Sequence, residues 1–419
     1  MRPVVAPETL VPRWTPISHA ILACLLALPA TQAQVRLPEL PSTQSPSLPG
    51  LPVDETLRGT RDAAGSTLRV VDDYTRRVDA LLRSERKRVD VTPAGDAMRR
   101  GEYLALDAND EMLARARATG FEVVRHEADA FGTSIAQLRD ARARAPARGM
   151  RALREAMPGA TIEYHHLYLA AAPSAADNAV TTGGPSRIRA GLVDGGVDTK
   201  AAGLSNVTVH RHGCDGRVVP QRHGTQVAIR LASGASGDVF AADVWCGMRA
   251  GGDTLGVIDA LRWMAKERVP VINLSLVGPD NAALKRTVDA LTSRGFVLVA
   301  AAGNDGPAAP PRYPAAYPPV IAVGALDARQ RPLPESASGA HLDFCAEGVV
   351  ARDARGTSFA APIVANAIAR DLVDVATPSP ARAAQALRRL EGIAVDVASP
   401  GRDARCGAGA ITSASGTSR

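Results

Sequence analysis

A serine in the C-terminal third of the chain has the surroundings of a nucleophile. Ser358 lies in the stretch GTSFAAP (residues 356–362) and opens an apolar run that continues to residue 368. A serine hydroxyl at a helix N-terminus can attack a carbonyl when a base takes its proton and hydrogen-bond donors hold the resulting oxyanion. The same Thr-Ser pair, taken alone, would also suit the N-cap of a buried helix. Partner residues elsewhere in the chain decide between these interpretations.

Two residues upstream provide the base and the carboxylate that such a serine needs. Asp194 follows the apolar run 188–193 and precedes two glycines, which predicts a carboxylate at the carboxyl end of a strand. His223 begins the stretch HGTQVA (residues 223–228), at the start of a predicted apolar helix. The residues that compete for these roles but lack this context are Asp198, His165, His166, His210 and His212.

The order Asp194, His223, Ser358 resembles that of the subtilisin-like serine peptidases, or subtilases. A fourth motif, AAGNDG (residues 301–306), resembles the segment of this family that provides the oxyanion hole. The resemblance implies that Ser358 attacks the scissile carbonyl, that His223 transfers the proton and that Asp194 orients the imidazole. It also implies that Asn304 donates its side-chain amide to the oxyanion.

The resemblance further implies how a substrate binds. The segment Leu274-Ser275-Leu276 is expected to pair with an extended peptide as an added strand. Val277 stands where the family has a glycine at this edge and is expected to narrow the cleft. Gly195 stands where the family usually has serine or threonine, so one hydrogen bond to Asp194 is expected to be absent.

Arg312 is the most unusual of the expected substrate-binding residues, which also include Gly303. It begins the stretch RYPAAYP (residues 312–318), and the resemblance places it where a small residue usually lines the pocket for the side chain before the scissile bond. A guanidinium there would attract an acidic substrate side chain and repel lysine or arginine. Alternatively, Arg312 turns outward to solvent and leaves an apolar pocket.

The N-terminal part of the chain has the features of an export signal followed by a linker. In residues 1–33, two arginines precede an apolar run and small residues follow it, as in a cleavable signal peptide. The apolar run is too short to span a bilayer, so no stable membrane insertion is expected after signal removal. Residues 34–100 are predicted to be a Pro/Ser-rich linker with one amphipathic helix near residues 68–82.

Residues 101–168 show a regular alternation of predicted elements. Strands are expected at 102–106, 121–125, 134–138 and 161–168, with helices at 109–119 and 147–157. This βαββαβ order predicts a small α+β domain with both helices on one face of a sheet. The resemblance implies a propeptide that assists folding and inhibits the enzyme, and an accessory domain that stays attached is the alternative. Residues 169–186 are the expected linker and processing zone.

Residues 187–419 alternate apolar strands with helices. This pattern predicts an α/β fold with a doubly wound, mostly parallel sheet that is covered by helices on both faces. Asp194 and Asn304 both follow predicted strands, and the functional groups of such sheets gather at the carboxyl ends of the strands. This part of the chain is therefore predicted to be a subtilisin-like peptidase domain.

Four cysteines remain after the predicted signal is removed: Cys214, Cys246, Cys345 and Cys406. An even number in an exported chain favours two disulfides, for which three pairings exist. We prefer Cys214 with Cys246 and Cys345 with Cys406, and the other pairings stay open. No CxxC unit is present, so no zinc site is predicted. No cofactor is expected, and calcium sites, common in the family, have no readable signature here.

The composition gives no sign of a nucleic-acid partner. The net charge is +6, but acidic and basic residues are interspersed and no basic stretch contains interleaved aromatic residues. The expected partners are therefore polypeptide substrates and the chain's own propeptide.

The predicted function is an exported, self-processing serine endopeptidase that is secreted or periplasmic. The alternative is a catalytically weak subtilase-fold protein that binds peptides or acts as a scaffold, because Val277 compromises the cleft. An esterase is disfavoured because Ser358 lacks the Gly-x-Ser-x-Gly elbow.

Overall fold

The computed structural model describes residues 73–128, 132, 134–171, 186–248, 251–351, 354–374 and 377–412, which all belong to one unit, Asp54–Arg419. The predicted signal peptide and the Pro/Ser-rich stretch of the linker lie outside the described residues, as does most of the predicted processing zone. No described helix has both the length and the apolar character that a membrane span requires.

A parallel sheet forms the centre of the C-terminal part. Its strand order is β17-β14-β13-β12-β10-β6-β8-β7, and each neighbouring pair is parallel. The central strands β10, β12 and β13 are buried at every position because both faces of the sheet are covered. The strands are β6 Ser186–Asp194, β7 Val207–His212, β8 Ala235–Asp243, β10 Val271–Leu274, β12 Val297–Ala301, β13 Ile321–Leu326, β14 Leu342–Glu347 and β17 Ala410–Ile411.

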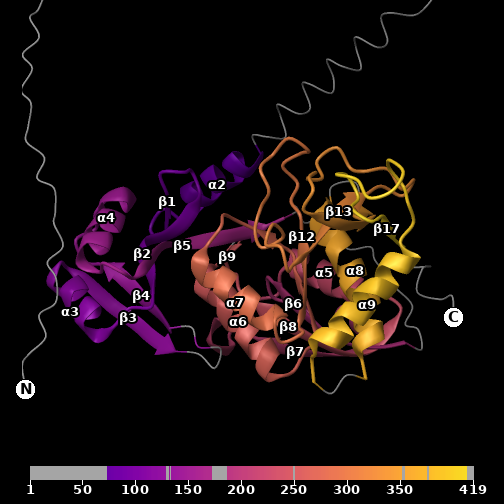
Figure 1. Cartoon of the computed structure of the whole chain (residues 1–419), viewed down its shortest axis with the longest axis horizontal. Coiled ribbons are helices and arrows are strands. Elements are labelled where there is room, and N and C mark those ends of the chain that lie inside the picture. Colours follow the sequence, from indigo (N-terminus) through magenta and orange to yellow (C-terminus); the bar gives the residue numbers. More distant parts are fainter. Residues whose placement is uncertain are drawn as a thin grey trace, which may run out of the picture. The chain divides into compact units, whose positions relative to one another are not determined.

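Helices cover the two faces of this sheet in separate layers, as Figure 1 shows. Helices α5 (Arg222–Leu231), α8 (Thr357–Leu372) and α9 (Pro380–Ile393) share one apolar cluster with the sheet. Helices α6 (Thr254–Lys266) and α7 (Ala282–Thr292) share the other. The fold is therefore the predicted doubly wound α/β arrangement of the subtilisin-like class.

An antiparallel sheet forms the N-terminal part and has the predicted βαββαβ order. Helices α3 and α4 pack on it around one apolar cluster that includes Tyr103, Leu113 and Leu153. Strand β2 begins at Ala97 and β5 extends to Ala170, so both are longer than predicted. The elements are β1 Val89–Val91, β2 Ala97–Leu106, α3 Asp110–Ala118, β3 Phe121–Ala128, β4 Ser134–Asp140, α4 Pro146–Ala156 and β5 Thr161–Ala170.

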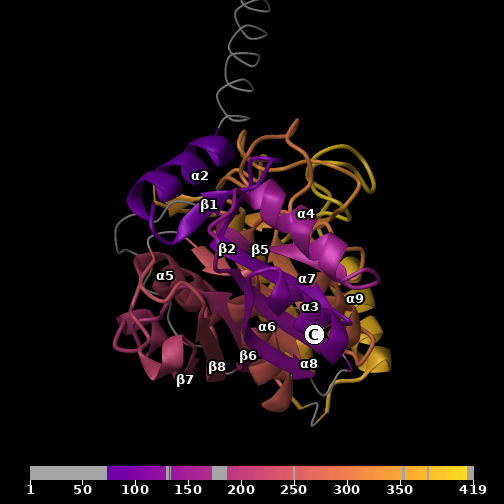
Figure 2. The ribbon, with the colours of Figure 1, turned by 90° about the vertical axis from the view of Figure 1, so that its left-hand side faces the viewer.

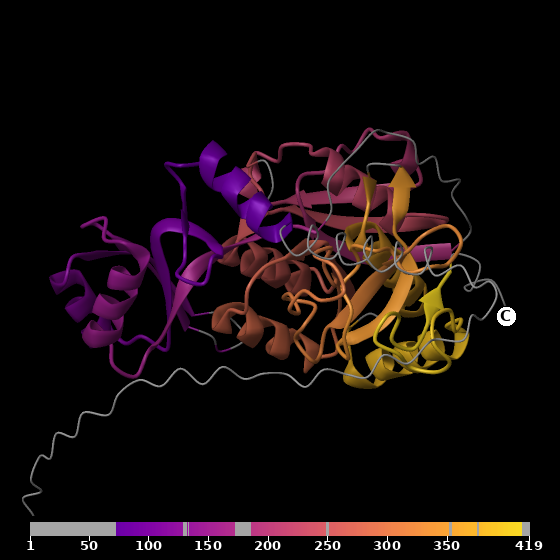
Figure 3. The ribbon, with the colours of Figure 1, turned by 90° about the horizontal axis from the view of Figure 1, so that it is seen from above.

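Strand β5 connects the antiparallel sheet to the C-terminal part (Figure 3). One edge of β5 pairs antiparallel with β9 (Gly251–Asp253), and β11 (Leu276–Val277) also pairs antiparallel with β5. The sheet order is accordingly β11-β5-β2-β4-β3. Both β9 and β11 belong to the C-terminal part, so the two parts share one continuous sheet.

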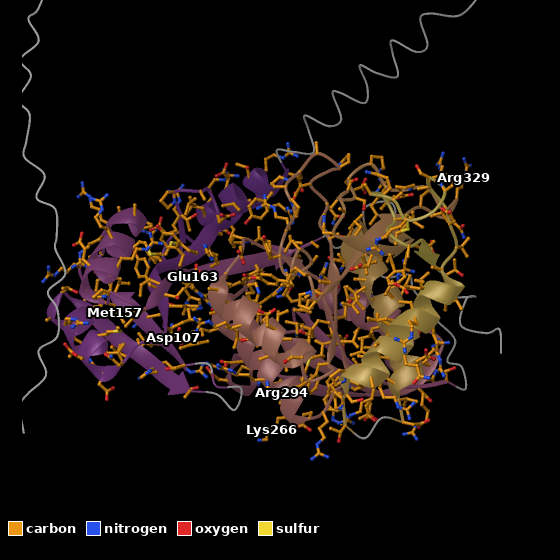
Figure 4. The ribbon with its side chains drawn as sticks, viewed as in Figure 1. Asp107, Met157, Glu163, Lys266, Arg294 and Arg329 are labelled. Carbon is orange, nitrogen blue, oxygen red and sulfur yellow. A yellow bond between two sulfur atoms is a disulfide. The ribbon has the colours of Figure 1, made fainter. Side chains whose placement is uncertain are left out.

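Side chains on the antiparallel sheet add contacts to helix α7. Asp107 forms an ion pair with Arg286 at 2.6 Å, and Glu163 accepts a hydrogen bond from the backbone of Ala282 at 3.2 Å. Asp107 and Glu163 are labelled in Figure 4. These contacts fix the N-terminal part against the face of α7.

Helix α2 (Asp73–Ser84) precedes the antiparallel sheet and lies beside β1 (Figure 2). Its apolar face shares a buried cluster with β5 and with a residue of the C-terminal part. The members are Tyr74, Val78 and Leu81 of α2, Leu167 and Leu169 of β5, Val89, Ala97 and Met248. This is the amphipathic helix that the sequence predicts. The sequence pattern does not indicate which element it packs against, and the structure shows that this element is β5.

The remaining elements are short. Strands β15 (Val349–Ala351) and β16 (Ala354–Arg355) form a two-stranded sheet, and two 3-10 turns occupy Ala202–Leu204 and Cys214–Gly216. The structure contains two disulfides, Cys214–Cys246 and Cys345–Cys406, which are the pairs preferred from the sequence.

Candidate active site

Asp194 and His223 come together at the carboxyl end of the parallel sheet. Asp194 is the last residue of β6, and its Oδ1 accepts a hydrogen bond from Nδ1 of His223 at 2.8 Å. The backbone N–H of Gly195 donates to the same oxygen at 2.6 Å, whereas Oδ2 is buried with no hydrogen-bond partner among the described residues. Gly224 lets α5 approach this strand end, because a side chain there would collide with the Gly195 carbonyl.

The imidazole of His223 lies between two aromatic rings. Trp245 stacks on it with centroids 5.6 Å apart, and Phe359 of α8 lies at 5.4 Å. The ring is almost fully buried, and Nε2 has no hydrogen-bond partner within the described part of the chain. The histidine is therefore held through one nitrogen and by contacts with two aromatic rings, and the second nitrogen is available for a proton.

Ser358 lies in the first turn of α8 and contacts the strand edge at Ser275. Its hydroxyl donates to the Ser275 carbonyl at 3.3 Å, and the Ser275 hydroxyl donates to the Ser358 carbonyl at 3.0 Å. Asn273 donates its amide to the Ser275 hydroxyl at 2.8 Å. The Ser358 hydroxyl is thus directed at a carbonyl and not at His223, although Phe359, the next residue, contacts the imidazole.

Asn304 lies three residues after β12, and both ends of its amide are engaged. Oδ1 accepts from the backbone of Thr357 at 3.0 Å, which orients the amide so that Nδ2 faces the cleft. Nδ2 donates to the carbonyl oxygen of Ala171, the residue that follows β5. Gly356 is required beside it, because its φ is 139° and a side chain there would collide with the Asn304 amide.

The end of β5 occupies the position of an extended peptide beside Asn304. Leu276 pairs with Ala170 in antiparallel register, and the N–H of Ala171 donates to the Ser275 carbonyl at 3.3 Å. On the other edge of β5, Leu169 pairs with Gly251 of β9. The predicted edge therefore begins at Ser275 and includes Val277, which pairs with Leu169, while Leu274 pairs within the parallel sheet.

Arg77 of α2 reaches this peptide-like strand, although nothing in the sequence indicates it. Nη1 donates to the carbonyl oxygen of Ala170 at 2.6 Å, and Nη2 donates to Oδ1 of Asp305 at 3.0 Å. Asp305 directly follows Asn304 and is almost fully buried. One guanidinium therefore joins α2, β5 and the segment that carries Asn304.

Arg312 lies against α2, where it contacts an aromatic ring and two carboxylates, and does not turn out to solvent. Its guanidinium carbon lies 3.6 Å from the centroid of the Tyr74 ring. Nη1 lies 3.6 Å from Oδ1 of Asp96, and Nε lies 3.8 Å from Oδ2 of Asp305. The side chain is 18% exposed, so its charge is compensated by carboxylates of the protein itself.

Two further groups of buried ionisable residues surround the site. Asp243 of β8 lies next to Asp194 in the sheet register, and burial raises the pKa of its carboxyl despite hydrogen bonds from three backbone N–H groups. In β5, burial alone would lower the pKa of His165, but the carboxylates of Asp253 and Glu102 outweigh it and raise that pKa to about 8. Burial and the neighbouring His165 lower the pKa of His166 to about 4.

No group of three or more histidine, cysteine, aspartate or glutamate side chains in the described ranges could hold a metal ion. The arrangement combines an aspartate–histidine pair, a buried serine at a helix N-terminus and an amide aimed at a peptide carbonyl.

Comparison with known proteins places these residues in a described family. A family model described as the subtilase family matches residues 188–409, which include Asp194, His223, Asn304 and Ser358. Subtilisin DY of Bacillus licheniformis is 32% identical over 240 residues, which make up 51% of this chain and 85% of that protein. Subtilisin E of Bacillus subtilis (strain 168) is 32% identical over 210 residues, or 44% of this chain and 55% of that protein.

Among solved structures, fervidolysin from Fervidobacterium pennivorans is similar in fold. It is described as a keratinolytic enzyme related to subtilisin, and the match has a TM-score of 0.62. The alignment covers 79% of this chain and 62% of fervidolysin, with 19% sequence identity. At this identity the likeness supports the fold alone.

Proposed function

Because this chain belongs to the subtilase family of serine endopeptidases, we propose that it hydrolyses peptide bonds with Ser358 as nucleophile and His223 as general base. Asp194 orients the imidazole and stabilises its cation. The hydrogen bond between Asp194 and Nδ1 of His223 supports this assignment, as does the buried Nε2 that has no partner among the described residues.

The reaction follows from these positions. The Ser358 hydroxyl turns from the Ser275 carbonyl toward His223, and Oγ attacks the carbonyl carbon of the substrate while its proton moves to Nε2. The carbonyl oxygen becomes an oxyanion, which receives a hydrogen bond from Nδ2 of Asn304. Collapse of this tetrahedral intermediate breaks the C–N bond of the substrate, and the leaving amine takes the proton from His223. Water then attacks the acyl-serine by the same proton route and releases the acid.

The first substrate that we assign to this site is the chain's own peptide bond between Ala171 and Ala172. The observation that carries this assignment is the hydrogen bond from Asn304 Nδ2 to the Ala171 carbonyl oxygen, where an oxyanion would form. The pairing of Ala170 with Leu276, and of the Ala171 N–H with Ser275, supports the same alignment. This narrows the processing zone of residues 169–186 to one bond.

The segment that precedes the cut acts as an inhibitor after cleavage. Strand β5 is held by β9 and by β11, and Arg77 of the same segment pairs with Asp305 of the peptidase part; none of these contacts depends on the bond after Ala171. The polypeptide substrates of the mature enzyme therefore compete with this segment for the same cleft.

Export is the setting that we assign to the enzyme. The two disulfides suit an oxidising compartment, and residues 1–33 have the composition of a signal peptide.

Self-cleavage is tested by comparing the wild-type chain with the Ser358→Ala variant in a host that lacks extracellular proteases. The wild type should yield a mature form whose N-terminal residue is Ala172, and the variant should stay joined at this bond. Adding a trace of active enzyme to the variant separates cutting within one molecule from cutting between molecules. A variant that is cut at the same bond without added enzyme would contradict self-processing.

A further inference from the structure

We propose that Val277 and Arg312 close the pocket beside Ala171, so that the mature enzyme cuts after small residues and excludes large ones. The inference rests on the proposed function, because it treats the end of β5 as a bound substrate. It assigns the preference to the size of the substrate side chain and not to its charge.

The backbone of Ala171 is fixed on two sides. Its N–H donates to the Ser275 carbonyl at 3.3 Å, and its carbonyl oxygen accepts from Asn304. Ser275 lies two residues before Val277, and Asn304 directly follows Gly303, so both partners of Ala171 belong to the segments that carry the proposed pocket walls. The residue is 1% exposed and belongs to the same buried apolar cluster as Val277.

Gly303 marks the point at which the pocket walls converge. A Cβ at this position would lie 3.9 Å from Cγ1 of Val277 and 3.8 Å from Cγ of Arg312. Two side chains from different segments therefore reach the same place at van der Waals distance. Any larger side chain that enters beside Gly303 meets the valine methyl groups and the arginine methylenes.

The two walls are tied to each other by backbone hydrogen bonds. The N–H of Gly278 donates to the Tyr313 carbonyl at 2.8 Å, and the N–H of Tyr313 donates to the Gly278 carbonyl at 3.0 Å. These residues directly follow Val277 and Arg312. The pocket is therefore unable to widen by moving one segment without breaking this pair.

Asp305 keeps Arg312 over the pocket when the N-terminal segment leaves. Departure of that segment removes Tyr74 and Asp96 from Arg312, but Asp305 stays because it belongs to the peptidase part. The Asp305 side chain is 3% exposed and its Oδ2 lies 3.8 Å from Nε of Arg312. The guanidinium is then already compensated, so an acidic substrate side chain gains little from it.

The test uses matched peptides that differ only in the residue before the scissile bond: Ala, Leu, Phe and Glu. For the self-processed wild-type enzyme, we expect kcat/KM for the Ala peptide to exceed that for the Phe peptide by about 100-fold or more. The Val277→Ala and Arg312→Gly variants should each lower this ratio by about tenfold. Val277→Ala is chosen over glycine because it keeps a side chain on the strand edge.

Two controls carry the same kinds of change far from the cleft. Val395→Ala and Arg329→Gly alter exposed residues and should leave the Ala-to-Phe ratio unchanged. A wild-type enzyme that cuts the Phe peptide as fast as the Ala peptide would overturn the inference. So would an unchanged ratio in both cleft variants, or a wild-type preference for Glu over Ala.

Failure of the proposed function is distinguishable from failure of this inference. An enzyme that cuts none of the peptides would contradict the proposed function. Binding of the same peptides to the Ser358→Ala variant, from which limited digestion with another protease has removed the N-terminal segment, then tests the pocket without turnover. Tighter binding of the Ala peptide than of the Phe peptide supports the inference, and equal binding refutes it.

Discussion

Replacing Arg77 by alanine is expected to loosen the N-terminal segment from the cleft after processing. Its guanidinium donates to the Ala170 carbonyl at 2.6 Å and to Asp305 at 3.0 Å, and it is only 23% exposed. Hydrogen bonds that involve a charged group contribute about 1.5–3 kcal/mol each. Ala170 leaves with the segment, so only the contact with Asp305 crosses to the peptidase part. Arg312 also compensates Asp305, and part of the Arg77 contact is accessible to water, so we expect a loss of about 1–2 kcal/mol.

This loss corresponds to a dissociation constant of the cleaved segment that is about 5- to 30-fold larger. The assay dilutes the self-processed complex stepwise and follows hydrolysis of a peptide with alanine before the scissile bond. The Arg77→Ala enzyme should become active at a correspondingly higher concentration than the wild type. Arg83→Ala is the matched control, because Arg83 lies on the same helix and is exposed.

An Arg77→Ala complex that dissociates at the same concentration as the wild type and the Arg83 control would contradict this prediction. The segment would then be held by β-strand pairing and apolar contacts, and the Arg77 guanidinium would have no part in latency.

Three further predictions concern pH, catalysis and stability. The segment should bind most tightly near pH 6.5, the ordinary pKa of histidine. As the pH falls toward 4, binding weakens because His166 of the released segment takes up a proton that the docked His166 resists. As the pH rises toward 8, binding weakens because the docked His165 loses the charge that pairs it with its carboxylates. Activation rates measured from pH 4 to 9 should therefore pass through a minimum. His166→Gln should remove the rise in rate on the acid side, and His165→Gln should remove the rise on the alkaline side. A flat wild-type profile would contradict both assignments. Asn304→Ala should lower kcat by about 10²–10³-fold with little change in KM, and an unchanged kcat in steady-state kinetics would argue against its role at the oxyanion. Replacing Cys345 and Cys406 by serine should lower the free energy of unfolding by about 2–4 kcal/mol without abolishing the fold, as thermal denaturation with circular dichroism would measure; a double variant that melts like the wild type would mean that this bridge stabilises nothing.

Local patterns in the sequence predict most of the elements. Asn109, with two acidic residues after it, predicts the start of α3, and in the structure its side chain caps that helix by accepting from Met112. The alternation of apolar strands and helices predicts the doubly wound sheet, because a strand buried on both faces has to be apolar throughout. The motifs around Asp194 and His223 predict a pair that the structure brings to 2.8 Å.

The contacts between distant segments are harder to predict, because no periodicity reports them. Arg77 and Asp305 are far apart in the chain, and no sequence pattern links the two. Their contact depends on how β5 lies between β9 and β11, which is a property of tertiary packing. The same holds for Arg312, whose position beside Tyr74 depends on where α2 packs.

The length of β5 is a second example. The pattern of residues 161–168 predicts a strand, but the small residues that follow it read as the beginning of a linker. Pairing with Leu276 extends β5 to Ala170, and the amide of Asn304 holds the carbonyl of Ala171. A partner strand thus supplies the hydrogen bonds that local propensity does not specify.

Labelling the processed enzyme with a fluorophosphonate and mapping the adduct by mass spectrometry shows whether Ser358 is the nucleophile activated by His223. We expect one adduct per active molecule, on Ser358, and strongly reduced labelling in a His223→Ala variant. An adduct on another residue, or Ser358 labelled equally well without His223, would contradict this assignment.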